Sequence, residues 1–145
     1  MRRMIPDDLP TILEWFTDYF LENQKKMPMD VELNIKQVRK FFEHALKQPS
    51  LIGFMSEDGV ILGEESETWF GPNKVGRGLL WYVRPKARNG ILAMRLLKAF
   101  DEEAKNRGAR FCRMELDNPA NLKTIDGLVK KAGYEDYSKI YVRRL

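Results

Sequence analysis

A chain of 145 residues has the length of one ordinary domain and is long enough to bury a hydrophobic core. Apolar residues make up 43% of the chain and charged residues 32%, a composition that excludes an intrinsically disordered protein. The net charge of +4 comes from 25 basic and 21 acidic residues that are interspersed, so we expect solvated charged faces and no nucleic-acid partner. A modest positive field would also suit an anionic cofactor.

The apolar runs and the cysteine count narrow the class of protein further. The longest apolar runs, such as Gly78–Val83, are too short to span a bilayer, and no apolar stretch follows Arg2 and Arg3 as in a signal peptide. Cys112 is the only cysteine, which excludes an internal disulfide, and with the single histidine His44 it gives too few ligands for a zinc site. We therefore expect a cytoplasmic protein with no membrane partner, in which Cys112 is an inert core thiol.

The start of the chain predicts a short strand and a helix. Arg2–Ile5 fits a short strand, after which Asp7 and Asp8 provide capping carboxylates for a helix that extends to about Leu21. Glu22–Glu32 is polar and contains a proline, which indicates a loop or a short broken helix. Internal repeats and linker-like changes of composition are absent, so the whole chain, residues 1–145, is expected to form one domain.

A second helix and a three-strand meander are expected next. Asn34 and Gln37 form a capping-box pattern ahead of an apolar face that continues to about Lys47. Three strands then follow one another, separated by turn signals: Leu51–Ser56, Val60–Glu67 and Lys74–Val83. The dipeptide Asp58-Gly59 suits a tight hairpin turn, so neighbouring strands are expected to be antiparallel.

The last third of the chain alternates helices with strands. Apolar residues at helical spacing predict a long helix after Gly90 that ends at Gly108, and a strand over Arg110–Leu116 follows. A further helix ends at Gly133, and Lys139–Leu145 is expected to close the sheet as a final strand. The element order is that of a mixed α/β fold.

The junction between the strand that ends at Val83 and the helix after it predicts an anion site. First-turn N–H groups of a helix have no partners within the helix and point outward with the positive end of the helix dipole. A pyrophosphate fits such a site, because Gly90 allows close approach of the backbone and Arg88 or Lys86 adds positive charge. Many such junctions bind nothing, so a purely structural turn is the alternative.

The same segment resembles the cofactor motif of the GNAT acetyltransferases. Val83-x-Pro85-x-x-Arg88, followed by a small-residue loop and Leu96-Leu97, is similar to that motif, whose loop is commonly R/Q-x-x-G-x-G/A. In the register that aligns the two leucines, the loop reads Arg88-Asn89-Gly90-Ile91-Leu92-Ala93. The arginine and the final small residue match, while Ile91 replaces the first glycine.

The resemblance implies a fold and a cofactor. Asp7-Asp8-Leu9-Pro10 and Lys130-Lys131-Ala132-Gly133-Tyr134 also resemble family signatures, so it covers nearly the whole chain. It implies a GNAT-like α/β fold in which about four helices flank a central, mostly antiparallel sheet with splayed fourth and fifth strands. In that family the pantetheine arm of acetyl-CoA lies in the gap between those strands. The positions that match the cofactor site are Trp81, Val83, Arg88, Asn89, Gly90, Ile91, Leu92, Ala93 and Asn121, with Asn118 as the alternative to Asn121.

The resemblance also implies direct attack of an amine on the thioester, assisted by a base and by an acid that protonates the departing thiolate. The tyrosine that often serves as the acid is replaced here by Val129. For the base we expect Glu67, because a turn centred near Asn73 would set it opposite Leu79 beside the gap. Glu65 would lie on the same face, and two neighbouring carboxylates can raise the pKa of one of them. A solvated acidic strand face is the alternative.

Two functions are consistent with these residues. The first, which we favour, is an N-acetyltransferase that moves an acetyl group from acetyl-CoA to a primary amine of a small molecule, peptide or protein. The second is a catalytically inactive GNAT-fold protein that serves as a binding or assembly module, which Ile91 and Val129 favour. A homodimer is compatible with either function.

Overall fold

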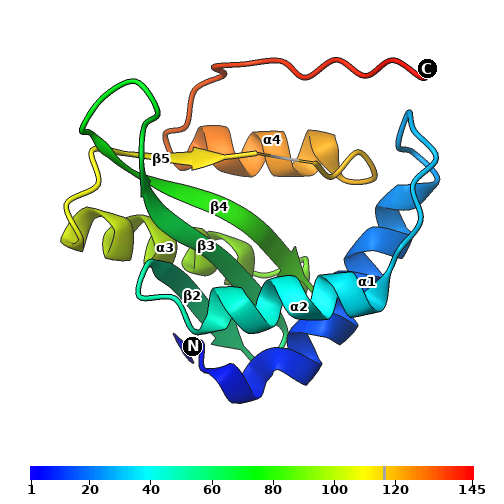
Figure 1. Cartoon of the computed structure of the whole chain (residues 1–145), viewed down its shortest axis with the longest axis horizontal. Helices are drawn as coiled ribbons and strands as arrows, with labels where there is room; N and C mark the ends of the chain where they lie inside the picture. Colours follow the sequence, from blue (N-terminus) through cyan, green and yellow to red (C-terminus); the bar gives the residue numbers. More distant parts are fainter. Residues whose placement is uncertain (116) are drawn as a thin grey trace.

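The structure is a computed structural model that describes residues 1–115 and 117–145 (Figure 1). The described strands are β1 (Arg2–Arg3), β2 (Leu51–Ser56), β3 (Gly59–Glu67), β4 (Lys74–Val83) and β5 (Phe111–Met114). The described α-helices are α1 (Leu9–Gln24), α2 (Ile35–Leu46), α3 (Leu92–Asn106) and α4 (Leu122–Lys131). Short 3-10 turns, η1 (Pro6–Asp8) and η2 (Pro85–Ala87), precede α1 and α3.

The strands form one sheet in the order β1-β2-β3-β4-β5. Neighbours from β1 to β4 are antiparallel, whereas β5 runs parallel to β4. The meander and the mixed, mostly antiparallel sheet predicted from the sequence are therefore confirmed. One irregularity interrupts the pairing of β3 with β4, between Leu62 and Gly63.

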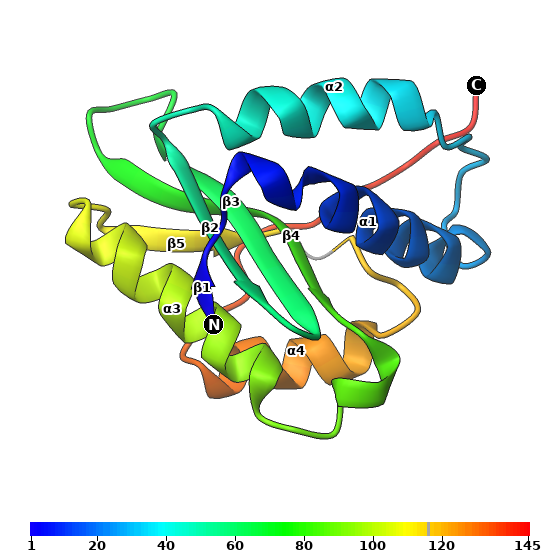
Figure 2. The same ribbon diagram turned by 90° about the horizontal axis from the view of Figure 1, so that it is seen from below.

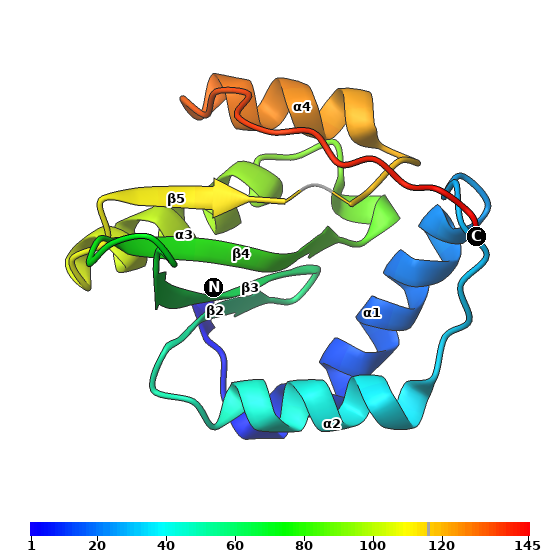
Figure 3. The ribbon, with the colours of Figure 1, turned by 45° about the horizontal axis from the view of Figure 1, so that its top comes forward.

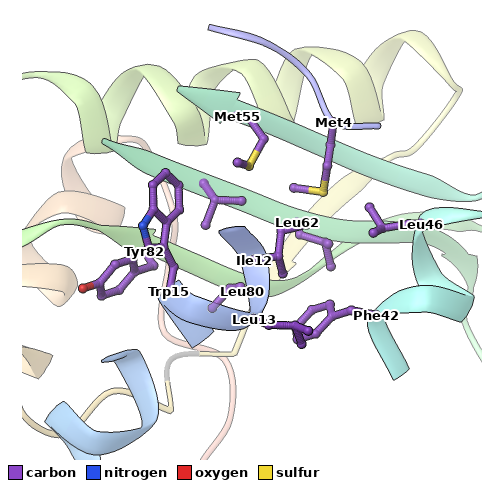
Figure 4. Close-up of a cluster of buried hydrophobic side chains, with 11 residues drawn as sticks. Met4, Ile12, Leu13, Trp15, Phe42, Leu46, Met55, Leu62, Leu80 and Tyr82 are labelled. Carbon is purple, nitrogen blue, oxygen red and sulfur yellow. The ribbon is translucent and has the colours of Figure 1, made fainter. Parts of the chain in front are cut away.

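Two helices cover each face of the sheet, α1 and α2 on one side and α3 and α4 on the other (Figure 2). The core under α1 and α2 (Figure 4) contains Met4, Ile12, Leu13, Trp15, Phe42, Leu46, Met55, Val60, Leu62, Leu80 and Tyr82. The core under α3 and α4 contains Ile52, Ile61, Val83, Leu96, Leu97, Phe100, Ala104 and Val129. Successive side chains of a strand point to opposite faces, so β4 contributes to both cores. None of the described helices is both long and apolar enough to cross a membrane.

Helix α1 continues past the predicted end at Leu21 and stops at Gln24. A long-range contact accounts for the extra residues, because the side chain of Asn23 is fully buried. Its amide donates to the Tyr19 carbonyl at 2.8 Å, and its oxygen accepts from the Ala120 N–H at 3.0 Å. The end of α1 is thereby attached to the segment that precedes α4.

The predicted final strand over Lys139–Leu145 is wrong. The described residues after α4 form no strand, and β5 is the last member of the sheet. Because no strand lies beside these residues, their backbone has no ladder to join, and side chains such as Ile140 and Tyr141 are exposed. The segment instead runs from the end of α4 toward the C-terminal end of α1, where Arg144 pairs with Asp30 at 2.6 Å (Figure 3).

Candidate functional site

The pairing of β4 with β5 ends partway along β4. The last pair is Gly78 with Met114, whereas β4 continues to Val83 while paired only with β3. Figure 1 shows the two strands side by side at one end and diverging toward η2. The expected splay of the fourth and fifth strands is therefore present, and it opens toward the N-terminus of α3.

Main-chain groups of the unpaired half of β4 face the gap. The N–H of Arg84 donates to the Asp58 carbonyl at 2.8 Å, on the β3 side. N–H and C=O groups alternate between the two edges of a strand, so those of Val83 and Trp81 point to the opposite edge, toward the gap. The Val83 carbonyl accepts from Nε of Arg88 there at 2.8 Å. The main-chain groups of Trp81 and the N–H of Val83 therefore remain to face the gap.

A narrow cavity of about 20 Å³, enough for about one water molecule, lies in the gap. Residues from β4, from the segment after β5, from α1 and from α4 line it: Tyr19, Gly78, Leu79, Leu80, Trp81, Met114, Glu115, Asp117, Asn118 and Ile125. The cavity thus joins elements that are far apart in the sequence.

Two buried polar atoms of this lining have no hydrogen-bond partner among the described residues. They are Nε1 of Trp81, a donor, and Oδ1 of Asn118, an acceptor. Asn118 is buried, with 8% of its surface exposed. An unsatisfied buried polar group costs about 1–3 kcal/mol. A ligand with one carbonyl and one N–H could satisfy both atoms.

Arg88, predicted to lie near phosphate, is held by a carboxylate from α1. Its guanidinium forms a two-bond ion pair with Glu22, one bond of which is 2.8 Å long, and it lies 5.5 Å from the ring centre of Tyr82. The hydrogen bonds from Arg88 lower the pKa of Glu22, and those to Glu22 raise the pKa of Arg88. Glu22 also accepts from the side-chain amide of Asn121 at 2.9 Å. Arg88 and Asn121 are therefore both bound to Glu22 in this structure.

The loop amides at the start of α3 are the remaining groups that could bind an anion. The helix begins at Leu92, and its first intrahelical bond runs from the Arg95 N–H to the Ile91 carbonyl at 3.0 Å. The N–H groups before Arg95, those of Leu92 and Ala93 included, have no helical partner. Asn89, Gly90 and Ile91 are exposed. A phosphate group could approach this turn without displacing a side chain.

Tyr19, Glu115 and Asp117 are titratable groups in the cavity lining that sequence reasoning did not assign to the site. The Tyr19 hydroxyl donates to the Asp117 carbonyl, and burial, with the nearby Asp117 carboxylate, raises the pKa of Tyr19 to about 12. This phenol stays protonated at neutral pH and can act as a proton donor. Glu115 lies 3.2 Å from Arg113. No sequence motif marks these residues, because α1 and the segment after β5 meet only in the folded chain.

The register expected for Glu67 is wrong. Glu67 pairs with Lys74 and Glu65 with Gly76, so neither lies opposite Leu79 or Trp81. The β3–β4 connection spans residues 68–73 and is centred near Gly71, ahead of Asn73. Glu67 is exposed at the far end of the hairpin and does not line the cavity. The structure does not bring Glu67 together with the other candidate residues.

Val129 and Cys112 lie on the α3 and α4 side of the sheet. Val129 is buried in that core, away from the cavity lining. Cys112 packs against the same core, where burial first, and the nearby Asp101 second, raise the pKa of its thiol to about 12. A thiol in this state is not a nucleophile at neutral pH, as the sequence predicted. The described residues contain no group of three or more potential metal ligands.

The chain is similar to known proteins in structure. No protein-family model matches the chain, and no curated protein matches its sequence. A protein of Clostridium acetobutylicum, described as a predicted acetyltransferase and solved with acetyl-CoA, has a TM-score of 0.79 at 15% identity, with 99% of this chain and 94% of that chain covered. An integron cassette protein from a salt-marsh metagenome has a TM-score of 0.74 at 19% identity, with coverages of 99% and 88%.

An aminoglycoside acetyltransferase from an uncultured soil metagenomic sample, solved in complex with sisomicin, is also similar. Its TM-score is 0.67 at 14% identity, with 99% of this chain and 94% of that chain covered. Identities this low show the fold alone. The chain has the fold of the GNAT acetyltransferases, as its sequence predicted.

Proposed function

We propose that this chain binds acetyl-CoA between β4 and β5 and transfers the acetyl group to a primary amine. The observation that carries the proposal is the pair of unpartnered buried atoms, Nε1 of Trp81 and Oδ1 of Asn118, in the lining of one cavity. Pantetheine contains two amides, and an amide offers the carbonyl and the N–H that this donor and this acceptor require. The likeness in fold to a protein solved with acetyl-CoA supports the same cofactor.

In this proposal the cofactor follows the open half of β4. Its pyrophosphate lies on the first-turn amides of α3, around Gly90 to Ala93, where the helix dipole favours negative charge. Its pantetheine arm passes between Trp81 and Asn118. The cavity of about 20 Å³ is too small for that arm, so the strands must move apart on binding. The Arg88–Glu22–Asn121 contacts hold the loop and the start of α4 at the two sides of the entrance.

The acid–base groups of the proposed reaction come from the same cavity. The amine nitrogen attacks the thioester carbonyl, the new C–N bond forms, and the C–S bond breaks. Tyr19, a phenol that is protonated at neutral pH, gives a proton to the departing thiolate. Glu115 attracts the cationic amine and takes up its proton through water. We propose a small amine-bearing molecule as the acceptor, since one neighbour of the same fold binds sisomicin.

Thermal unfolding with acetyl-CoA tests the binding step. A ligand at about one hundred times its dissociation constant adds about 2.7 kcal/mol to the free energy of unfolding. Asn118→Leu should raise the stability of the free protein, because it removes an unsatisfied acceptor, and weaken acetyl-CoA binding about tenfold, or about 1.4 kcal/mol. Asn106→Leu, at the exposed C-terminal end of α3, is the matched control and should leave affinity unchanged.

Release of free thiol with a panel of amines, aminoglycosides included, tests the transfer step. Tyr19→Phe should lower kcat about a hundredfold while acetyl-CoA affinity stays within about twofold, since general acids contribute about 10²–10⁴ in rate. An unchanged kcat would remove Tyr19 from the mechanism.

The narrow cavity and Val129 favour a second function, a GNAT-fold binding module without transfer activity. The two functions differ in the same experiments. The absence of stabilisation by millimolar acetyl-CoA would contradict the transferase. Stabilisation without turnover of any amine would identify a cofactor-binding module.

A further inference from the structure

The pairing of β4 with β5 stops where β4 carries an extra residue. Two neighbouring residues of β3 pair with Gly78 and Leu80 of β4, so Leu79 between them has no partner on β3. An extra residue of this kind is a β-bulge, which bends its strand and increases the local twist. The last pair of β4 with β5, Gly78 with Met114, comes directly before the bulge. The bend therefore accounts for the closed end of the gap at this pair.

The side chain of Met114 fills the closed end of the gap. Gly78 has no side chain, and a Cβ atom there would lie 2.2 Å from Sδ and 2.7 Å from Cε of Met114. The thioether of Met114 therefore occupies the space that a side chain at Gly78 would need. Met114 also lines the cavity of about 20 Å³ and packs against the core under α3 and α4. The glycine thus allows this long, unbranched side chain to lie across the end of the cavity.

The acyl group is the part of the ligand that comes nearest to Met114 under the proposed function, on which this inference rests. The phosphate groups lie on the first turn of α3, and the pantetheine arm passes between Trp81 and Asn118. From there the arm continues along β4 toward Gly78, because Trp81 lies between that residue and α3 in the chain. The thioester at the end of the arm then lies beside the pair of Gly78 with Met114.

Met114 and its neighbour Glu115 lie on opposite sides of this end of the gap. Met114 packs toward α3 and α4, and a Cβ atom at Gly78 would point to the same side. Arg77, the residue before Gly78, points to the other face, and Glu115 lies 3.9 Å from its Nε atom. In the proposed reaction the amine, which Glu115 attracts, therefore approaches from the α1 side, and the acyl group points toward Met114.

We propose that Met114 restricts the donor to short acyl groups and makes acetyl the preferred one. The methyl group of acetyl fits against the thioether, whereas the further carbons of a longer acyl chain need the space that the thioether occupies. One methylene too many in a hydrophobic pocket changes binding by about 10–200-fold. Because methionine is flexible, the preference of this protein is expected at the lower end of that range.

Calorimetric titration with coenzyme A, acetyl-CoA and butyryl-CoA tests this role. Wild type should bind acetyl-CoA about tenfold more tightly than butyryl-CoA. Met114→Ala removes the thioether and should bind butyryl-CoA more tightly than acetyl-CoA, because each methylene accommodated in the vacated space adds about fourfold in affinity. The affinity for coenzyme A, which has no acyl group, should be unchanged. Met114→Val, a smaller truncation that suits a strand, should shift the preference in the same direction.

Two control variants separate this role from general effects of packing. Met114→Leu keeps nearly the same volume and should keep the preference for acetyl-CoA. Met55→Ala makes the same truncation at a methionine that is buried in the core under α1 and α2, and it should also keep that preference.

Two outcomes would overturn the proposal: a wild type that binds both acyl-CoA molecules equally well, or an unchanged preference in the folded Met114→Ala and Met114→Val variants. A wild type that binds none of the three ligands would contradict the proposed function itself, and the role of Met114 with it.

Discussion

The two halves of β4 meet β5 in different ways. In the closed half, Val75 to Gly78 pair with Phe111 to Met114, and glycines let the chains come close. A Cβ atom at Gly78 would lie 2.2 Å from the sulfur of Met114. In the open half, the strands part, and the large side chain of Trp81 and the amide of Asn118 carry polar atoms without partners.

Under the proposed function, the closed half stabilises the sheet and the open half binds the ligand. The close packing of its strands makes the closed half a stabilising part of the sheet. The open half gives up hydrogen bonds that a folded chain normally makes, which is a cost that a bound ligand can offset. Substitutions in the closed half should therefore change the free energy of unfolding, and those in the open half should change ligand affinity.

The largest effect is expected at Gly63 of β3, which lies opposite Gly78, the last residue of the closed half. A Cβ atom there would lie 2.1 Å from the Arg77 carbonyl oxygen and 2.7 Å from the Phe100 ring. Because a backbone atom cannot move aside, Gly63→Ala should cost about 3 kcal/mol of unfolding free energy, measured by urea denaturation. Acetyl-CoA affinity of the folded fraction should be unchanged.

Gly127 provides the control for that substitution. It lies within α4, and a Cβ atom there would meet nothing within 4 Å. Gly127→Ala should stabilise the protein by about 0.5–1 kcal/mol, because alanine favours the helix. A mild effect of Gly63→Ala, comparable to this one, would contradict the close packing of the closed half.

The second largest effect is expected at Glu22, which binds the open half through Arg88 and Asn121. Glu22→Gln should cost about 2 kcal/mol, since hydrogen bonds to charged groups contribute about 1.5–3 kcal/mol. The folded-state pKa of Glu22 is lowered from 4.5, so its contribution is present above pH 4.5 and is lost as pH falls through that lower pKa. The stability difference between wild type and variant should therefore shrink below pH 4.5.

Glu103 offers the comparison for that pH dependence. Hydrogen bonds from Arg3 and then Arg107 lower its pKa to about 2, far from the open half. Its contribution should persist to lower pH than that of Glu22. Glu103→Gln should leave acetyl-CoA binding unchanged, whereas Glu22→Gln should weaken it because the entrance loses its ion pair. Equal effects of the two variants on binding would contradict this role for Glu22.

The smallest effect is expected at Trp81. Trp81→Phe removes the unpartnered Nε1 donor and keeps an aromatic ring, so the free protein should keep its stability or gain. Acetyl-CoA affinity, measured by calorimetry, should fall about tenfold, or about 1.4 kcal/mol. Trp69→Phe changes a 94% exposed tryptophan outside the site and should change neither quantity. Loss of stability without loss of affinity at Trp81 would reverse the contrast between the two halves.

The sequence predicted the elements well because their signals are local. The apolar spacing of Leu96, Leu97 and Phe100 fits a helix, and all three are fully buried where α3 packs on the sheet. The capping pattern at Asn34 is confirmed by its side chain, which accepts from the Gln37 N–H at 3.1 Å. The predicted strand over Lys139–Leu145 was wrong. A strand needs a neighbouring strand, and the composition of a segment alone does not provide one.

The site was less predictable because its residues meet only in the folded chain. The junction before α3 and the Trp81 main chain were readable from a strand followed by a loop and a helix. The pairing register of Glu67 could not be predicted, because an error in the position of the turn shifts every residue pair of the β3–β4 hairpin. Glu115 and Asp117 carry no motif, and nothing near Asn118 in sequence marks its unsatisfied oxygen.

The sequence by itself determined the order of helices and strands up to α4, the mixed α/β class and the turn before α3, since these depend on residues within a few positions of each other. Only the tertiary structure decided that Arg88 binds Glu22, 66 residues earlier, and that Asn118 shares a cavity with Trp81. Pairings of this kind follow from how the helices pack on the sheet. The gap between β4 and β5 was expected from a resemblance, and its unpartnered atoms came from the fold.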